Sequence, residues 1–214
     1  MSFSPRHRQA DCAISNPPWL RPDHIDKLKL FGYLLTEKNS FINLISKKDV
    51  ENVYLKHILH SVLISEVVRF STGMRVMDAG TGGGFPGVPL AIVFPEVEFH
   101  LVDSIGKKMT ALTEMVSALQ LDNVRIYNER VERMSHRYDF VVSRAVTNPN
   151  VLCQWIRHTI KPVSRQSVAN GLLYLRGNEP LYMPIPHRTY ALKHFCAHPF
   201  FETKQLLHVP LPPL

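Results

Sequence analysis

Apolar residues recur at helical spacing along the first third of the chain. They follow this spacing from Asp23 to Leu35, and again after Asp49, which is expected to cap a second helix that ends before Gly73. The first 22 residues lack any such period. The pattern therefore predicts an irregular arm and then a helical extension, which together occupy residues 1–70.

Beyond residue 70, short apolar runs alternate with amphipathic segments. This alternation is typical of a mostly parallel sheet covered by helices. The expected strands are residues 75–79, 97–102, 124–127, 138–142 and 171–175. After several prolines, residues 190–197 and 204–209 are expected to pair as an antiparallel edge. The sequence thus predicts an α/β, Rossmann-like domain over residues 71–214, packed as one unit with the helical extension.

A glycine-rich stretch joins the first predicted strand to a helix that Pro86 is expected to begin. Glycines allow a ligand to approach the backbone closely. The pattern Gly82-x-Gly84-x-x-Gly87 fits a dinucleotide fingerprint, and Asp78-x-Gly80-x-Gly82-x-Gly84 fits the first motif of S-adenosylmethionine-dependent methyltransferases. In a dinucleotide site the first glycine should follow the strand almost at once, which would make it Gly80 and put Phe85 where that site needs its third glycine, so the second register is favoured. An ordinary glycine turn remains an alternative.

Charged residues stand at the predicted strand ends. Asp103 ends the second strand, where a carboxylate can accept hydrogen bonds from ribose hydroxyls. Residues 128–132 follow the third strand, at the edge where a bound adenine would lie. Arg144 leaves the fourth strand, and a buried strand seldom ends in arginine without a carboxylate or ligand partner. Lys107 begins a helix, which suggests a nearby phosphate.

Histidines and cysteines offer weak candidates for metal binding. His57 and His60 stand three apart on the second helix, without a further ligand at suitable spacing, so we expect them to line a surface or groove. His194, Cys196 and His198 would alternate onto one face of the expected edge strand, also without a fourth ligand. Three widely spaced cysteines indicate neither a disulfide framework nor a paired metal motif. We therefore expect no metal.

Composition limits the class of protein. With 214 residues, 45% of them hydrophobic, the chain can bury one main core. Its formal charge of +7 and pI near 9.4 suggest a polyanionic partner. No apolar run approaches the roughly 18 residues of a membrane span, and residues 1–8 lack an apolar signal-peptide core. These features predict a soluble cytoplasmic protein, which we expect to be a monomer.

Taken together, these motifs resemble the glucose-inhibited division protein B (RsmG) family, the bacterial guanosine-N7 methyltransferases of small-subunit (16S) ribosomal RNA. The likeness spans about residues 43–177. Its most specific parts are Asp78-Ala79-Gly80-Thr81-Gly82-Gly83-Gly84-Phe85-Pro86-Gly87, Leu101-Val102-Asp103-Ser104, Arg130-Val131-Glu132 and Ser143-Arg144-Ala145. Three positions depart from the family pattern: His60 for aspartate, Arg176 for lysine, and a single Gly171 for a glycine pair.

The resemblance implies a class I methyltransferase fold, S-adenosyl-L-methionine as cofactor, and ribosomal RNA or a small-subunit ribonucleoprotein as partner. It implies cofactor-binding roles for Asp78, Gly80, Thr81, Gly82, Gly84, Phe85, Asp103, Ser104, Val131, Glu132 and Arg144. It further implies catalytic or RNA-binding roles for Asn43, His57, Lys107, Arg130 and Arg144. Arg133, Arg137 and Arg176 are expected to add RNA affinity.

The chemistry of guanine N7 agrees with this set of residues. N7 has an in-plane lone pair and loses no proton on methylation, so no general base is needed and positioning is the main demand. Enzymes that methylate exocyclic amines carry an Asn-Pro-Pro-aromatic loop after the fourth strand. Here Asn16-Pro17-Pro18-Trp19 precedes every predicted strand and is expected to be a turn before a helix. A non-catalytic RNA-binding ribosome assembly factor, a nicotinamide-dependent oxidoreductase and a small-molecule methyltransferase are the alternatives.

Overall fold

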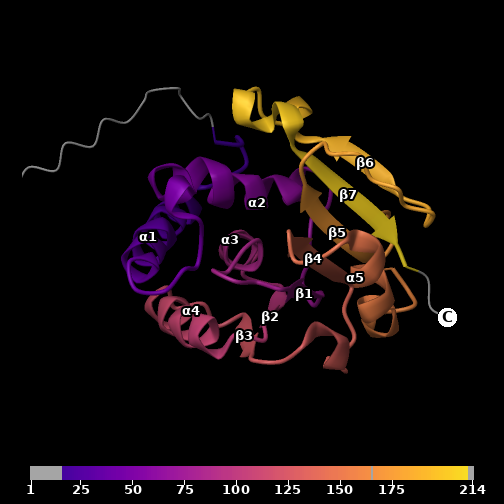
Figure 1. Ribbon diagram of the computed structural model, residues 1–214, viewed down its shortest axis with the longest axis horizontal. Coiled ribbons are helices and arrows are strands. Elements are labelled where there is room, and N and C mark those ends of the chain that lie inside the picture. Colours follow the sequence, from indigo (N-terminus) through magenta and orange to yellow (C-terminus); the bar gives the residue numbers. More distant parts are fainter. Residues whose placement is uncertain (1–15, 165, 212–214) are drawn as a thin grey trace, which may run out of the picture.

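A seven-stranded sheet forms the centre of the computed structural model, which describes residues 16–164 and 166–211 (Figure 1). The strand order is β3-β2-β1-β4-β5-β7-β6. All pairs from β3 to β5 are parallel, whereas β7 runs antiparallel to both β5 and β6. The strands are β1 (Arg75–Ala79), β2 (Glu98–Val102), β3 (Val124–Tyr127), β4 (Phe140–Arg144), β5 (Gly171–Arg176), β6 (Arg188–Ala191) and β7 (Gln205–Pro210). The predicted mostly parallel sheet with an antiparallel pairing near its edge is confirmed.

Helices cover both faces of this sheet (Figure 1). The α-helices are α1 (Pro22–Asn39), α2 (His60–Val62), α3 (Gly87–Val93), α4 (Gly106–Ala118) and α5 (Pro149–Ile156). Shorter 3-10 turns are η1 (Lys47–Asn52), η3 (Leu63–Glu66), η4 (Val131–Arg133), η5 (Arg157–Thr159), η6 (Leu192–His194) and η7 (Pro199–Thr203), and η2 (Tyr54–Leu59) is a π-helical turn. None of the helices in the described ranges has the length and apolar character that crossing a membrane requires.

The two faces of the sheet bury separate hydrophobic cores. On one face, Phe31 of α1 and Leu112 of α4 join Val76 of β1 in a large cluster that includes the helices of the amino-terminal extension. On the other face, Leu152 and Ile156 of α5 pack against Val141 and neighbouring strand residues. Each fully buried aliphatic or aromatic side chain contributes about 1.5–3 kcal/mol of transfer free energy. Both faces therefore fix the strand ends, where the motifs stand.

The second helical segment differs from the prediction. It is not one helix capped by Asp49, but a succession of 3-10, π-helical and α-helical turns. Asp49 lies inside η1, and its carboxylate accepts a hydrogen bond from Lys56 Nζ at 2.7 Å instead of capping a backbone amide. The preceding loop is held by Asn39, whose Oδ1 accepts from the amides of Leu44 and Ile45, both at 2.9 Å.

Two strands, β4 and β6, differ most from their predicted ranges. The fourth strand begins at Phe140, because Asp139 turns its buried carboxylate to Arg75 N and Lys161 Nζ, while Tyr138 makes only an isolated bridge. β6 ends at Ala191, because the chain turns into η6. The predicted alternation of His194, Cys196 and His198 on one strand face is therefore wrong.

Candidate functional site

The glycine stretch forms a tight loop between β1 and α3. Gly80, Gly82 and Gly84 have backbone φ values of +70°, +55° and +97°, which residues other than glycine rarely adopt. Fully buried Asp78 anchors this loop, since its Oδ2 accepts from Thr81 Oγ1 at 2.6 Å and from the Gly87 amide at 2.8 Å. Burial raises the pKa of Asp78 to about 7. Asp78 and Thr81 therefore hold the conformation of the loop from its buried side.

Asp103 follows β2 and binds the glycine loop that follows β1. Its Oδ2 accepts from the Gly82 amide at 3.0 Å, and its Oδ1 accepts from the Ile105 amide at 3.0 Å. Each carboxylate oxygen has two acceptor positions, so a free one remains on both oxygens. Asp103 can therefore hold the glycine loop and still accept hydrogen bonds from two ligand hydroxyls.

A crevice of about 170 Å³ opens beside these residues, at the carboxyl ends of the parallel strands. Six residues expected at the site line it: Gly80, Asp103, Ser104, Arg130, Val131 and Glu132. Glu129, Val146 and Trp155 complete the lining. Trp155 was not expected, because the sequence marked it only as an apolar residue of a helix.

The crevice and its surroundings fit S-adenosylmethionine. Enclosed ligand sites usually measure about 300–1,000 Å³, so a crevice of this size has room for only part of such a molecule. The glycine loop has room, since a Cβ built on Gly82 would find its nearest heavy atom, the Gly80 carbonyl oxygen, 4.0 Å away. At Gly80 a Cβ would instead lie 2.2 Å from Val146 Cγ2.

A second group of predicted residues surrounds Arg144. The half-buried Arg144 places Nη2 2.7 Å from His57 Nδ1, and its Cζ lies 4.9 Å from the centre of the Phe85 ring. The Phe85 ring is buried and also contacts His57, with ring centres 5.1 Å apart. Burial lowers the pKa of Arg144 to about 10, so the guanidinium stays charged at neutral pH. The end of β4 thus presents a fixed cation.

The remaining predicted residues lie elsewhere. Gly84 packs into the core, since a Cβ there would approach Val88 to 2.8 Å. Asn43 and Lys107 are exposed, and neither belongs to the described lining of the crevice. Arg137 precedes β4, near the amino ends of the strands and therefore away from the crevice, and its contribution to RNA affinity stays a prediction.

His57 and His60 are buried, so of the two predicted roles the surface one is wrong, and the groove-lining one stays a prediction. Their exposed fractions are 8% and 5%. The His60 ring packs edge-on against Phe200 and Phe201 of η7, with ring centres 5.7 and 5.9 Å away. In the described ranges, no group of three or more histidine, cysteine or acidic side chains is placed to hold a metal ion.

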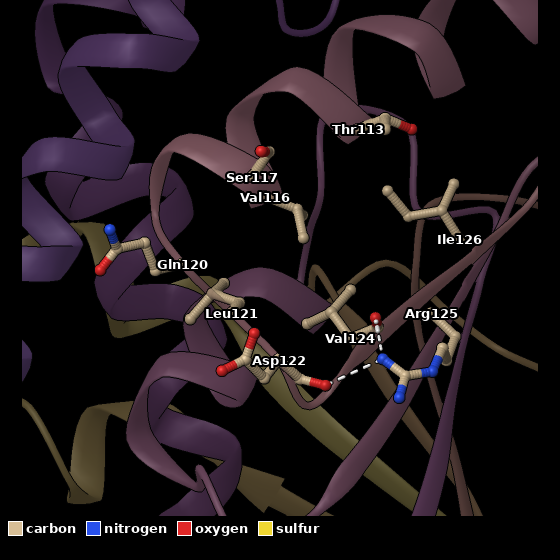
Figure 2. A pocket seen from close by; sticks show the side chains of 9 residues that line it. All are labelled: Thr113, Val116, Ser117, Gln120, Leu121, Asp122, Val124, Arg125 and Ile126. Carbon is tan, nitrogen blue, oxygen red and sulfur yellow. Dashed lines mark hydrogen bonds between the residues drawn. The ribbon is translucent and has the colours of Figure 1, made fainter.

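A larger hollow of about 410 Å³ lies between α4 and the edge strand β3 (Figure 2). Its charged lining residues within the described ranges are Asp122 and Arg125, and Arg125 Nη1 donates to the carbonyls of Asp122 and Val124 at 2.8 and 3.0 Å. The guanidinium is thus engaged with its own turn. This hollow does not contain the motif residues, and the crevice remains the candidate site.

Comparison with known proteins identifies the family. The family model described as "rRNA small subunit methyltransferase G" (GidB) matches residues 24–177. A ribosomal RNA small subunit methyltransferase G from Phocaeicola vulgatus is 47% identical over 182 residues, covering 83% of this chain and 87% of the relative. Its counterpart from Flavobacterium johnsoniae is 43% identical over 197 residues, covering 91% and 94%.

Among solved structures, a mutant of MtNAS in complex with S-adenosylmethionine is similar in fold. Its TM-score is 0.57 at 15% sequence identity, and the match covers 90% of this chain and 77% of that one. The fold and the family match agree with the glycine register described above. The chain belongs to the rRNA small subunit methyltransferase G family.

Proposed function

We propose that the chain transfers the methyl group of S-adenosylmethionine to N7 of a guanosine in small-subunit (16S) ribosomal RNA. The observation that carries the proposal is the crevice at the strand ends, where the glycine loop and Asp103 lie beside the cationic end of β4. When bound, S-adenosylmethionine supplies an electrophilic methyl group on a sulfonium. The chain's own residues then have to bind and orient both the cofactor and the guanosine of the RNA.

The end of β4 supports N7 as the acceptor. Arg144-Ala145-Val146 stands after the fourth parallel strand, where enzymes that methylate exocyclic amines carry an Asn-Pro-Pro-aromatic loop. The Asn16-Pro17-Pro18-Trp19 stretch is a turn before α1, where Asn16 Oδ1 accepts from Tyr54 Oη at 2.9 Å. N7 loses no proton on methylation, so a cation that orients the base is sufficient, and a general base is not required.

Each group of residues has a proposed role. Asp103 would accept hydrogen bonds from the ribose hydroxyls, and Val131 and Glu132 would border the adenine. Arg144 would bind either the carboxylate of the cofactor or O6 of the guanine. Exposed Lys107 and Arg130, together with Asn43, would contact the RNA. The glycines leave the backbone open to the cofactor, with Asp78, Thr81 and Phe85 holding the loop in place.

The positive charge supports a ribonucleic acid partner. Lysines and arginines exceed acidic residues by 25 to 18, and Arg130, with a 64% exposed side chain, lies at the rim of the crevice. We propose that the protein acts as a monomer in the cytoplasm, on ribosomal RNA or on a small-subunit particle. Family membership favours methyl transfer over a nicotinamide-dependent oxidation and over a purely structural role in ribosome assembly.

Tryptophan fluorescence gives a direct test of cofactor binding. Trp155 lines the crevice, whereas Trp19, the second tryptophan of the chain, donates Nε1–H to Glu66 on the helical extension. Titration with S-adenosylhomocysteine should change the emission of the wild type and of Trp19→Phe, but not that of Trp155→Phe. Calorimetric titration with S-adenosylhomocysteine and with NAD provides the control. Binding of NAD without binding of S-adenosylhomocysteine would overturn the proposal.

A further inference from the structure

The hydrogen bond between Arg144 and His57 fixes the protonation of the histidine ring. A guanidinium can only donate, so His57 Nδ1, 2.7 Å from Arg144 Nη2, has to accept. The ring proton must then reside on Nε2. A doubly protonated ring would have no lone pair for Arg144 and would place two cations side by side. The contact therefore requires the neutral Nε2–H tautomer.

A carboxylate lies on the other side of the same ring. Asp49 Oδ2 is 3.5 Å from His57 Nε2, and Asp49 Oδ1 accepts from Lys56 Nζ at 2.7 Å. The hydrogen bond from Lys56 lowers the pKa of Asp49, which keeps the carboxylate ionised at neutral pH. Asp49 thus attracts the proton at Nε2 and leaves Nδ1 free to accept from Arg144.

The surrounding backbone holds this set of residues in place. Lys56 and His57 belong to the π-helical turn η2, a rare conformation that recurs at functional sites. The Lys56 carbonyl accepts from Arg144 Nη1 at 3.4 Å, and Phe85 packs against both the His57 ring and the guanidinium. Burial, followed by the charge of Arg144, lowers the pKa of His57 to about 4. The ring is therefore neutral at neutral pH.

We propose that Asp49 and His57 are positioning residues that hold the Arg144 guanidinium in the orientation used for methyl transfer. The inference rests on the proposed function, in which Arg144 contacts the cofactor or the guanine. Asp49 acts through His57, by favouring the proton on Nε2, and His57 acts through its Nδ1 lone pair. His60 has no part in this chain of contacts, because its ring faces Phe200 and Phe201.

The tautomer can be measured without any activity assay. Nitrogen-15 spectra of the wild type at neutral pH should show His57 Nδ1 as a pyridine-type nitrogen and Nε2 as a protonated, pyrrole-type nitrogen. Arg144→Ala should shift the Nδ1 resonance and leave the Nε2 proton in place. A proton on Nδ1, or a doubly protonated ring at neutral pH, overturns the inference even if the protein is an active methyltransferase.

Kinetics then test whether the contacts serve Arg144. His57→Leu should lower kcat/KM by about tenfold or more, and His57→Asn should restore part of that loss, because its side-chain oxygen can accept from Arg144. Asp49→Ala alone should lower kcat/KM several-fold relative to the wild type. Added to His57→Leu, it should cause no further loss. Asp23→Ala is the matched control, because it breaks an exposed ion pair between this α1 residue and Arg21, just before the helix.

The outcomes separate this inference from the proposed function. Independent, multiplying losses from Asp49→Ala and His57→Leu would overturn it, and so would kcat/KM values within twofold of the wild type. A wild-type protein that transfers no methyl group to ribosomal RNA would instead contradict the proposed function. The nitrogen-15 measurement would still test the inference in that case. It would also do so if a variant failed to fold, because it is made on the wild-type protein.

Discussion

Gly82→Asn would test the glycine loop directly. Gly82 lies at φ +55°, and its amide donates to Asp103, beside the crevice. A Cβ at this position would meet only the Gly80 carbonyl oxygen, at 4.0 Å, so the asparagine amide would extend into the space proposed for the cofactor. Asparagine tolerates positive φ better than most residues, which separates added bulk from backbone strain. We expect the Kd for S-adenosylhomocysteine to rise at least about tenfold, or 1.4 kcal/mol.

Gly73→Asn provides the matched control. Gly73 also has positive φ, at +78°, but it precedes β1, at the amino ends of the parallel strands, whereas the crevice lies at their carboxyl ends. Both substitutions should cost about 1 kcal/mol of stability and lower the Tm by about 2–4 °C. Only Gly82→Asn should weaken binding in calorimetric titration. Wild-type affinity in Gly82→Asn, or an equal loss in Gly73→Asn, would refute the placement of the cofactor at this loop.

Three further predictions concern the charged residues. Lys107→Ala and Arg130→Ala should each flatten the log–log salt dependence of RNA binding by about one unit while leaving S-adenosylhomocysteine affinity nearly unchanged, and binding insensitive to salt would contradict this. Arg144→Ala should lower the turnover about a hundredfold or more with little change in Tm, and Arg144→Lys should rescue little, because a point charge cannot replace a planar, two-pronged donor; near-normal turnover would exclude the proposed role. The His57 pKa, lowered from 6.5 to about 4 by burial, means that the unfolded chain takes up this proton first as the pH falls, so stability is lost between about pH 6.5 and 4. Urea unfolding at pH 7 and 5 should show that His57→Asn avoids about 2 kcal/mol of this loss, and an equal loss in the variant would show that His57 is not responsible.

The central strands could be predicted because they are buried on both faces. Val76, Phe99 and Val141 belong to short apolar runs between polar breaks, and such runs have few alternatives in an α/β chain. The glycine register predicted the loop for a similar reason, since Gly80, Gly82 and Gly84 do adopt positive φ. Local chemistry was sufficient where local geometry decides the conformation.

Contacts between distant segments could not be predicted in the same way. Asp49 was expected to cap a helix, because its sequence neighbourhood fits that role, yet it pairs with Lys56 and His57. Nothing in the spacing of His57 shows that it packs against Phe85 and Arg144, which lie 28 and 87 residues further along the chain. Trp155 likewise reaches the crevice only because α5 packs beside β4. These features depend on tertiary packing, which the spacing of apolar residues within one segment does not reveal.

The most direct test of the central claim is transfer of labelled methyl from S-adenosylmethionine to small-subunit ribosomal RNA or particles, followed by mapping of the modified base. The proposed function predicts label on N7 of a guanosine, with transfer abolished or strongly reduced in Arg144→Ala and retained in the control Asp23→Ala. Label on an exocyclic amine, or no transfer to either RNA or particles by a protein that binds S-adenosylhomocysteine, would contradict it.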